Sequence, residues 1–451
     1  MATPLSRRRF LTQSAVAVGA AASAASLLDL GHLSRAEAAD DASVTTITVM
    51  GLTAEIHPQY ITDFERKNPA IKVRFLTFDP VRLNAMFNAG QPPDYIRIPG
   101  APDIPHTAAL GLALNLDPYF ARSKVLNPSN LLPVNNSFRW DGKVQGQGPR
   151  YGMTHGWEPD VQLWYNKTLF GQAGVTPPSA TQPLSYDELL RLAKKVTVRK
   201  HGKIQVYGLD PEWGWFTQAH ILNLLAQEGK TLWNADYTEA SFTSPEVRKI
   251  LQWYVDWAQA RVGPSPLDPD PQWTGALWQA NRLAMTTYGY WFEGFLIQNN
   301  PAQLKSAGFA PGPLWGPKRV SADMIDTGAY IAAASKNQDA AWAFFEYYMA
   351  GKPAYDRAVS GWGFSPLKSL MPLMPHATSE EQEFLTVAQN DVRYDTTLHF
   401  SPYISDAAME TAIQKYINPV MLGQAQLDSA LQQLEAAVNK QLQLGKQQVG
   451  G

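Results

Sequence analysis

Short apolar stretches near the start of the chain are separated by stretches with helical spacing. Residues 46–50, 71–76 and 95–98 are predicted as strands, because β-branched and aromatic residues dominate them and turn-forming residues follow. Residues 58–67 and 81–89 suit helices, and an Asn-Pro pair stops the first one. Strands that alternate with single helices predict crossover connections. We therefore expect an α/β fold with a mostly parallel sheet.

Capping residues and apolar stripes indicate further helices later in the chain. Ser185 and Glu188 have the spacing of a capping box, and Ser244 precedes a Pro at the first position of another helix. Asn337 can cap a third helix. The last predicted helix carries one apolar stripe, which should dock on the protein: Leu427, Leu431, Leu434, Val438 and Leu442.

The first 39 residues have the pattern of an export signal. Three arginines at 7–9 precede a mildly apolar run of small residues at 15–28, and residues 36–38 offer an A-x-A cleavage site. Adjacent arginines followed by Phe-Leu resemble the twin-arginine class, with an ordinary secretory signal as the alternative. The run is too short and too rich in Ala, Ser and Gly for a membrane span, which needs about 20 strongly apolar residues.

Length and composition narrow the class of protein. Without the signal, roughly 410 residues remain, enough for two lobes with their own cores. The formal net charge is −2, which does not favour binding to nucleic acid or anionic membranes. There is no cysteine, so we expect neither disulfides nor the lipid anchor that bacterial lipoproteins attach to a Cys. The predicted location is periplasmic or extracellular, in soluble form.

Motifs for metal, phosphate or nucleophilic chemistry are missing or incomplete. The eight histidines never occur at i, i+4, and no G-x-S-x-G motif occurs. Gly229-Lys230-Thr231 lacks the earlier Gly of a phosphate loop, and residues 146–148 lack the third Gly of a dinucleotide motif. We therefore predict no metal, cofactor or catalytic residue.

Carboxylates close to tryptophans leave one enzymatic interpretation open. Glu158, Asp160, Glu212 and Glu293 each lie near a Trp in the sequence. A glycosidase needs two carboxyl groups about 5 Å or about 6.5–9.5 Å apart across a sugar. The sequence does not supply that separation, and carboxylates that only accept hydrogen bonds from sugar hydroxyls would look the same. An exported polysaccharide-cleaving enzyme is therefore the alternative function.

Several blocks, in one consistent order, resemble the extracellular solute-binding proteins of ABC transporters, in their large, maltose-binding-protein-like class. Residues 91–95 resemble the family's G-x-x-P-D block before the third strand. Residues 151–170 are similar to Y-G-x-P followed by Y-Y-N-K-x-L-F, where the chain crosses between lobes. Residues 284–291 and 335–345 resemble the A-M-x-x-x-G-x-W and S-K-N-x-x-A-W-x-F blocks. The chain departs from the family at residues 153–155, where many members have Pro.

The resemblance implies a two-lobed periplasmic-binding-protein fold. Each lobe would be a mostly parallel sheet flanked by helices, and a multi-segment hinge would let the lobes close over a ligand. The expected divisions are residues 1–39 for the signal, 40–155 plus about 320–368 for lobe 1, 156–319 plus about 369–445 for lobe 2, and 446–451 for a flexible tail.

The resemblance also implies a function without catalysis. The protein would bind a sugar, expected to be an oligosaccharide, in the cleft between the lobes and deliver it to an ABC permease in the membrane. The expected partners are this carbohydrate, the permease and, during export, the twin-arginine translocase; the protein itself is expected to be a monomer. A polyol, phosphodiester or peptide ligand on the same fold is a further alternative.

Aromatic side chains dominate the predicted ligand site, because the C–H faces of sugars stack on indole and phenol rings. All 14 tryptophans lie between Trp140 and Trp362. Trp291 matches the family's cleft tryptophan, and Glu55 and Asp79 follow strands at the edge where open α/β sheets bind ligands. The full predicted set is Trp291, Tyr290, Trp213, Trp215, Trp157, Trp362, Glu55, Asp79 and Glu293. Five other aromatic residues are expected in the core: Trp164, Tyr165, Trp253, Trp257 and Trp342.

Overall fold

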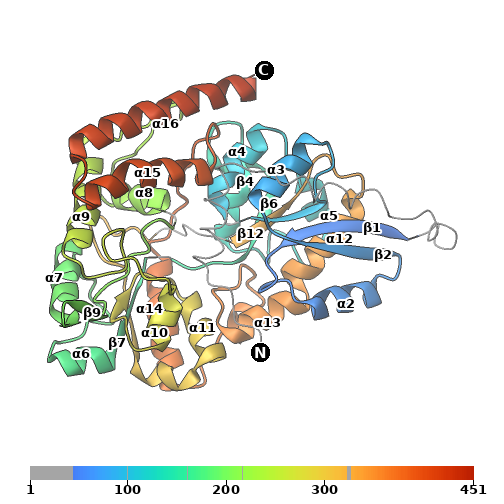
Figure 1. Cartoon of the computed structure of the whole chain (residues 1–451). Helices are drawn as coiled ribbons and strands as arrows, with labels where there is room; N and C mark the ends of the chain where they lie inside the picture. The colour runs from blue at the N-terminus through green and yellow to red at the C-terminus, as the bar shows by residue number, and fades with distance from the viewer. Residues whose placement is uncertain (1–43, 99, 160, 216, 322–326, 451) are drawn as a thin grey trace, which may run out of the picture.

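The chain forms two halves that lie side by side in the computed structural model (Figure 1). The structure describes residues 44–98, 100–159, 161–215, 217–321 and 327–450. The predicted export signal, residues 1–39, and Asp160 lie outside these ranges. None of the helices within them is long and apolar enough to cross a membrane.

The first half is built on a five-stranded sheet with the order β2-β1-β3-β12-β6. β1 runs parallel to β2 and β3, whereas β12 is antiparallel to β3 and β6. The strands are β1 (Thr45–Gly51), β2 (Ile71–Thr77), β3 (Tyr95–Ile98), β6 (Gly152–Gly156) and β12 (Thr327–Ile331). The helices are α2 (Pro58–Lys67), α3 (Pro80–Asn88), α4 (Ile104–Ala109), α5 (Asp117–Arg122), α12 (Gln338–Ala350) and α13 (Lys352–Ser360).

The predicted strands and helices of this half are confirmed, and their burial explains them. Ile47 and Val49 of the inner strand β1 are fully buried, whereas the edge strand β2 alternates between exposed and half-buried residues. The sheet itself is mixed, because β12 returns from far along the sequence and inserts antiparallel between β3 and β6. The expectation of a mostly parallel sheet therefore holds only for β1, β2 and β3, which follow one another in the chain with a helix between each pair.

The second half has a smaller sheet, with the order β10-β7-β11, whose strand pairs are antiparallel. This corrects the prediction of a mostly parallel sheet in each lobe. β7 (Leu163–Asn166) takes its neighbours from distant segments, β10 (Met285–Thr286) and β11 (Ala307–Ala310), so no crossover helix sets their direction. In the described part of this half, parallel pairing occurs as isolated bridges between two residues, such as Asp210 with Thr286.

Helices cover this second sheet. They are α6 (Lys167–Ala173), α7 (Tyr186–Val196), α8 (Thr217–Gln227), α9 (Pro245–Gln259), α10 (Thr274–Gln279), α11 (Trp291–Asn299), α14 (Ser379–Val392), α15 (Asp406–Met421) and α16 (Leu427–Gly450). The predicted capping box of Ser185 and Glu188 is confirmed at α7. The five aromatic residues expected in the core are all buried.

Hairpins and short 3-10 turns complete the chain. The hairpins pair β4 (Arg139–Trp140) with β5 (Gln145–Arg150), and β8 (Val198–Lys200) with β9 (Lys203–Val206). The 3-10 turns are η2 (Ala101–Asp103), η3 (Pro133–Phe138), η4 (Pro301–Ser306) and η5 (Met371–Leu373).

The predicted apolar stripe of α16 is buried, and the helix continues to Gly450. Residues 446–450 thus belong to the helix, and the flexibility expected for 446–451 stays a prediction. Gly445 packs directly on the backbone of Tyr403, where a Cβ atom would collide with the Tyr403 carbonyl. Lys446 and the two glutamines after it are good helix formers, so this glycine serves close packing and does not end the helix.

Candidate functional site

Two tryptophans from different halves face each other at the boundary. Trp291 is the first residue of α11, and its ring stacks on that of Trp362, with centroids 5.8 Å apart and an interplanar angle of 20°. Trp362 follows α13, a helix of the first half. The centroids of the Tyr288 and Trp291 rings are 4.7 Å apart. The structure thus brings together two of the predicted ligand residues.

Two further predicted residues, Tyr290 and Trp157, lie against Phe364 next to this pair. Tyr290 stacks on Phe364 with centroids 5.0 Å apart, and Trp157 meets it edge-on at 5.4 Å. Trp157 and Phe364 also exchange backbone hydrogen bonds, and the Trp157 indole donates to the carbonyl oxygen of Ser365. These contacts tie together two segments that cross between the halves, so Trp157 has a structural role at the crossing.

Buried polar atoms accompany these rings. The Trp362 indole N–H is buried and has no acceptor among the described residues. Burial raises the pKa of Glu293 to about 8, although the nearby Tyr290 hydroxyl opposes the rise, so the carboxyl group is mostly protonated at neutral pH. Gly294 permits this close approach, because a Cβ there would lie 2.7 Å from Cδ1 of Trp362.

Glu55 is held by an ion pair at the carboxyl ends of β1 and β3. The Arg97 guanidinium donates two hydrogen bonds to its carboxylate, at 2.8 and 2.5 Å. Burial alone would raise the pKa of Glu55, but the charge and hydrogen bonds of Arg97 outweigh burial, and the pKa falls to about 2. His155 of β6 lies 3.6 Å from the same carboxylate, and burial lowers its pKa well below the usual value, so the ring is neutral.

Arg357 of α13 links this ion pair to the aromatic group. Its positive charge acts on both Glu55 and His155, and its guanidinium donates a 3.2 Å hydrogen bond to the carbonyl oxygen of Trp362. Sequence reasoning missed both Arg97 and Arg357. Arg97 could have been suspected as a charged residue inside an apolar strand, whereas nothing in the helical pattern of α13 distinguishes Arg357.

Asp79 lies apart from this group. It is exposed, and its carboxylate accepts a hydrogen bond from the backbone N–H of Arg82, which caps α3. This is an ordinary N-cap role. A ligand contact by Asp79 stays a prediction.

Trp213 and Trp215 belong to a different apolar cluster from Trp291. Trp213 packs on Tyr254 at a centroid distance of 5.1 Å and donates a 2.8 Å hydrogen bond to Asn418 of α15. The preceding residue, Glu212, has a left-handed backbone with φ of 56°, which non-glycine residues rarely adopt. The structure therefore does not place these two tryptophans with the Trp291–Trp362 pair, and their contact with a ligand stays a prediction.

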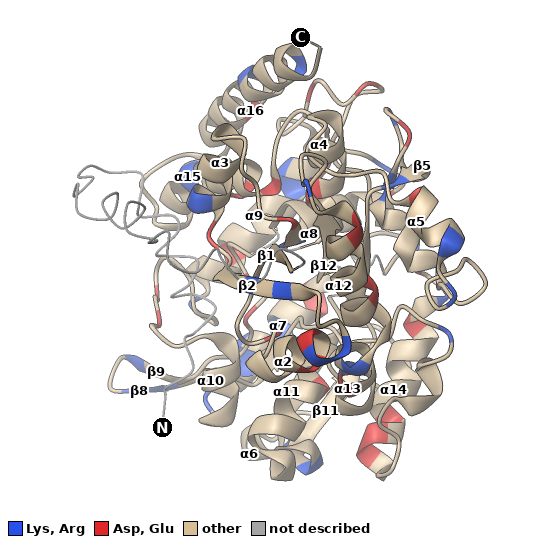
Figure 2. Ribbon diagram, turned by 90° about the vertical axis from the view of Figure 1, so that its right-hand side faces the viewer, with Lys and Arg blue, Asp and Glu red and all other residues tan. Residues whose placement is uncertain are grey.

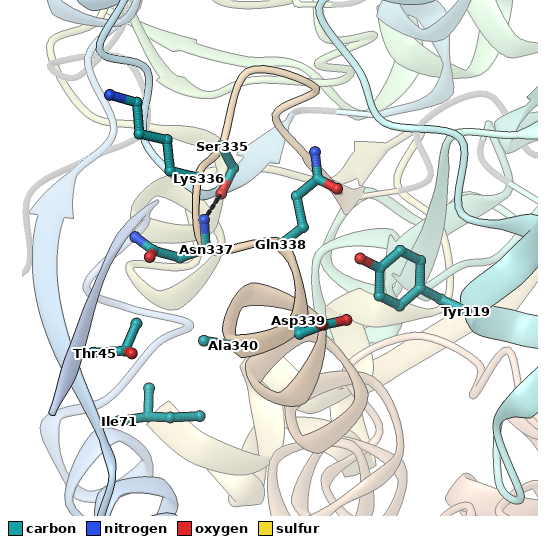
Figure 3. A pocket seen from close by; sticks show the side chains of 9 residues that line it. All are labelled: Thr45, Ile71, Tyr119, Ser335, Lys336, Asn337, Gln338, Asp339 and Ala340. Atoms are coloured by element: carbon teal, nitrogen blue, oxygen red, sulfur yellow. Dashed lines mark hydrogen bonds between the residues drawn. The ribbon is translucent and has the colours of Figure 1, made fainter. Parts of the chain in front are cut away.

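A pocket of about 720 Å³ lies elsewhere, at the start of α12 (Figure 3). Thr45 and Ile71, the first residues of β1 and β2, contribute to its wall, so it is at the opposite edge of the sheet from Glu55. Open α/β sheets bind ligands at the carboxyl ends of their strands. None of the predicted ligand residues lines this pocket, and we do not take it as the candidate site.

Basic and acidic residues are interspersed along the ribbon in Figure 2. On α2, for example, Asp63 pairs with both Arg66 and Lys67. The candidate site itself combines the Glu55–Arg97 ion pair and the guanidinium of Arg357 with aromatic rings and a carboxyl group of raised pKa. Aromatic faces with a few polar groups are typical of sites for polar organic ligands.

Residues 51–350 match the family of bacterial extracellular solute-binding proteins. A curated relative, an uncharacterized ABC transporter extracellular-binding protein from Pyrococcus horikoshii, is 23% identical over 287 residues, which cover 58% of this chain and 56% of that protein. The chain thus spans about half the length of this relative.

Solved structures share the fold over most of the chain. An ABC substrate-binding protein from Listeria monocytogenes in complex with cycloalternan is 24% identical, with a TM-score of 0.72, over 88% of this chain and 98% of that one. A solute-binding protein from Thermotoga lettingae with bound α-D-tagatose is 23% identical, with a TM-score of 0.73, over 88% and 100%. CpMnBP1 with bound mannotriose is 19% identical, with a TM-score of 0.72, over 87% and 99%.

Proposed function

The chain belongs to the family of bacterial extracellular solute-binding proteins, and we propose that it captures a sugar between its two halves for an ABC importer. The observation that carries this proposal is the face-to-face arrangement of Trp291 and Trp362, which come from opposite halves. Rings 5.8 Å apart leave no room for a sugar between them, so the halves must separate to admit one and close again around it. Only a ligand that prefers the closed arrangement can drive this closure.

The chemistry around the two rings favours a neutral, hydroxyl-rich ligand. Aromatic faces bind the C–H surfaces of sugars, and the unpartnered indole N–H of Trp362 can donate to a hydroxyl oxygen. A protonated Glu293 can both donate and accept hydrogen bonds. Arg97 is occupied by Glu55, so it is not free to bind the phosphate of a phosphodiester. The sugars bound by the related structures, one of them a trisaccharide and one a ketohexose by name, support the same class.

The enzymatic alternative has less support. The family and the related structures are binding proteins. Glu293 and Glu158 approach different glycines of one loop, Gly361 and Gly363, and bury their carboxylates against it. We therefore propose binding and release without bond cleavage.

Titration with a panel of neutral sugars tests the function. We expect mannotriose, other oligosaccharides, tagatose or mannitol to change tryptophan fluorescence and to raise the melting temperature. A ligand at 100 times its Kd adds about 2.7 kcal/mol to the free energy of unfolding. Silence across the panel at millimolar concentration would contradict the proposal, and release of shorter sugars from any oligosaccharide would favour the glycosidase alternative.

We propose that the protein reaches the periplasm or the cell exterior through the twin-arginine translocase and passes its ligand to a membrane permease as a soluble monomer. The motifs at residues 7–9 and 36–38 and the absence of cysteine support this route. Changing Arg8 and Arg9 together to Lys should leave the uncleaved chain in the cytoplasm. Arg35→Lys is the control and should be exported normally; export of the double variant would argue for an ordinary secretory signal.

A further inference from the structure

Three carboxyl groups gather where α4 of the first half meets the start of α15 of the second, in the upper part of Figure 1. Glu410 is buried, whereas Asp103 and Asp406 are half-buried. Asp103 precedes α4 in the first half, and Asp406 and Glu410 lie one turn apart on α15 in the second. The Asp103 carboxylate accepts a 3.0 Å hydrogen bond from the backbone N–H of Asp406. A second contact nearby joins the His106 ring to the Pro402 carbonyl oxygen at 2.9 Å.

These carboxyl groups lack compensating charge. Within the described ranges, no ion pair includes Asp103, Asp406 or Glu410. One oxygen of Asp406 and one of Glu410 are buried and have no hydrogen-bond partner in the described part of the chain. The other Glu410 oxygen accepts a 2.7 Å hydrogen bond from the backbone N–H of Gln218. The three groups therefore cannot all be ionised cheaply while the halves are in contact.

Neighbouring elements contribute few groups that could offset this charge. His106 of α4 lies nearby and favours the ionised form of Asp103. His220 of α8 contacts Tyr254, and burial lowers its pKa to about 4, so its ring is neutral. Tyr330 of β12 faces Asp103, and Tyr254 of α9 faces Glu410; both tyrosines are neutral at pH 7, because burial raises their pKa values. Glu212 also acts on Tyr254 and adds negative charge to the region.

Separation of the halves would change the environment of these carboxyl groups. Burial raises the pKa of Glu410 to about 7. Burial also raises the pKa of Asp406 well above its usual value, and the nearby negative charges of Glu410 and Asp103 raise it further. Asp103 and Asp406, which meet across the boundary, would then be exposed to water and titrate near their ordinary value of about 4. Glu410 contacts Gln218 of α8 within its own half, so it acts on the boundary through its charge on Asp406. The closed arrangement therefore binds more protons than the open one above about pH 4, because the pKa values of Asp103 and Asp406 are raised only while the halves are in contact.

We propose that Asp103, Asp406 and Glu410 form a proton-sensitive latch, which favours the closed arrangement at low pH and weakens it as the pH rises. The proposal rests on the two halves separating, as in the proposed function, but not on the identity of the ligand. A single shared proton changes the ratio of closed to open molecules by up to tenfold per pH unit. A ligand that needs the closed arrangement would be held more tightly at pH 5.5 than at pH 8.

Small-angle X-ray scattering of the ligand-free protein between pH 5 and pH 8 tests the latch. We expect the radius of gyration to increase with pH. Asp103→Asn and Glu410→Gln keep the hydrogen-bond acceptors but remove the charge, so each should reduce this increase, with the molecule staying compact at pH 8. Asp187→Asn is the control, because Asp187 is an exposed carboxylate in the first turn of α7.

Each outcome decides the proposal. A radius of gyration that does not change with pH in the unaltered protein overturns it, and so does a pH response that persists in both charge-removing variants. Far-UV circular dichroism confirms that the variants are folded, and the two substitutions lie in different halves, so a failure of one to fold leaves the other as the test. Because no sugar is added, a negative sugar panel would overturn the proposed function and leave this result standing.

Discussion

Replacing Trp291 with Ala should weaken binding of the sugar that the panel identifies by about a hundredfold. The substitution removes one of the two rings that face each other across the boundary. Truncation of a buried aromatic residue at the centre of a binding site costs about 2–4 kcal/mol of binding free energy, and every 1.4 kcal/mol is a factor of ten in Kd. Isothermal titration calorimetry of the folded variant measures the loss directly.

Trp342→Ala is a matched control for this substitution. Trp342 is 7% exposed and Trp291 is 8% exposed, and Trp342 stacks on Phe345 at 17° much as Trp291 stacks on Trp362 at 20°. Both variants should lose about 3–5 kcal/mol of folding free energy, because each leaves a cavity the size of an indole. Only the Trp291 variant should bind the sugar more weakly. Equal affinities of the two variants would show that Trp291 is a core residue and not a ligand contact.

The local elements of the fold could be predicted from the sequence, but the pairing of the second sheet could not. The strands at residues 45–51, 71–77 and 95–98 follow each other with one helix between, so their order and direction follow from short-range rules. β7 pairs with β10 and β11, which come from far along the chain, and no local pattern specifies whether such strands run parallel or antiparallel. The wrong prediction of a mostly parallel sheet in the second half arose because the sequence does not specify this pairing.

The candidate site could likewise be predicted only in part from the sequence. Trp291 and Trp362 were predicted as ligand residues because sugars stack on indole rings, and the structure brings the two together. The same argument also selected Trp213, which the structure places on the core around α9 and α15. The sequence shows which side chains can stack on a sugar. It does not determine which surface the loop that carries each of them packs on. Glu55 was found by its position at a strand end, whereas its partner depends on the register between β1 and β3.

Arg97→Met should lower the free energy of unfolding at pH 7 by about 3–5 kcal/mol. The substitution removes the cation that pairs with the Glu55 carboxylate, whose side chain is 18% exposed, and leaves it only the weaker effect of Arg357. Such a loss is far more costly than the loss of a surface ion pair. Arg122→Met is the control: Arg122 pairs with Asp339 at 2.7 Å, but both side chains are exposed, so we expect a change of less than about 1 kcal/mol. Urea unfolding of the two variants gives the comparison.

The pH dependence of this difference separates lost charge pairing from lost packing. In the unaltered protein, the Glu55 pKa is about 2, below its ordinary value of about 4.5, so the ion pair stabilises the fold fully above pH 4.5 and loses that effect as the pH falls toward 2. Without Arg97, burial raises the pKa of Glu55, and protonation relieves the variant on acidification. The gap in unfolding free energy between the two proteins should therefore narrow from pH 7 to pH 3. A gap that stays constant over this range would mean that Arg97 stabilises the fold through its packing alone.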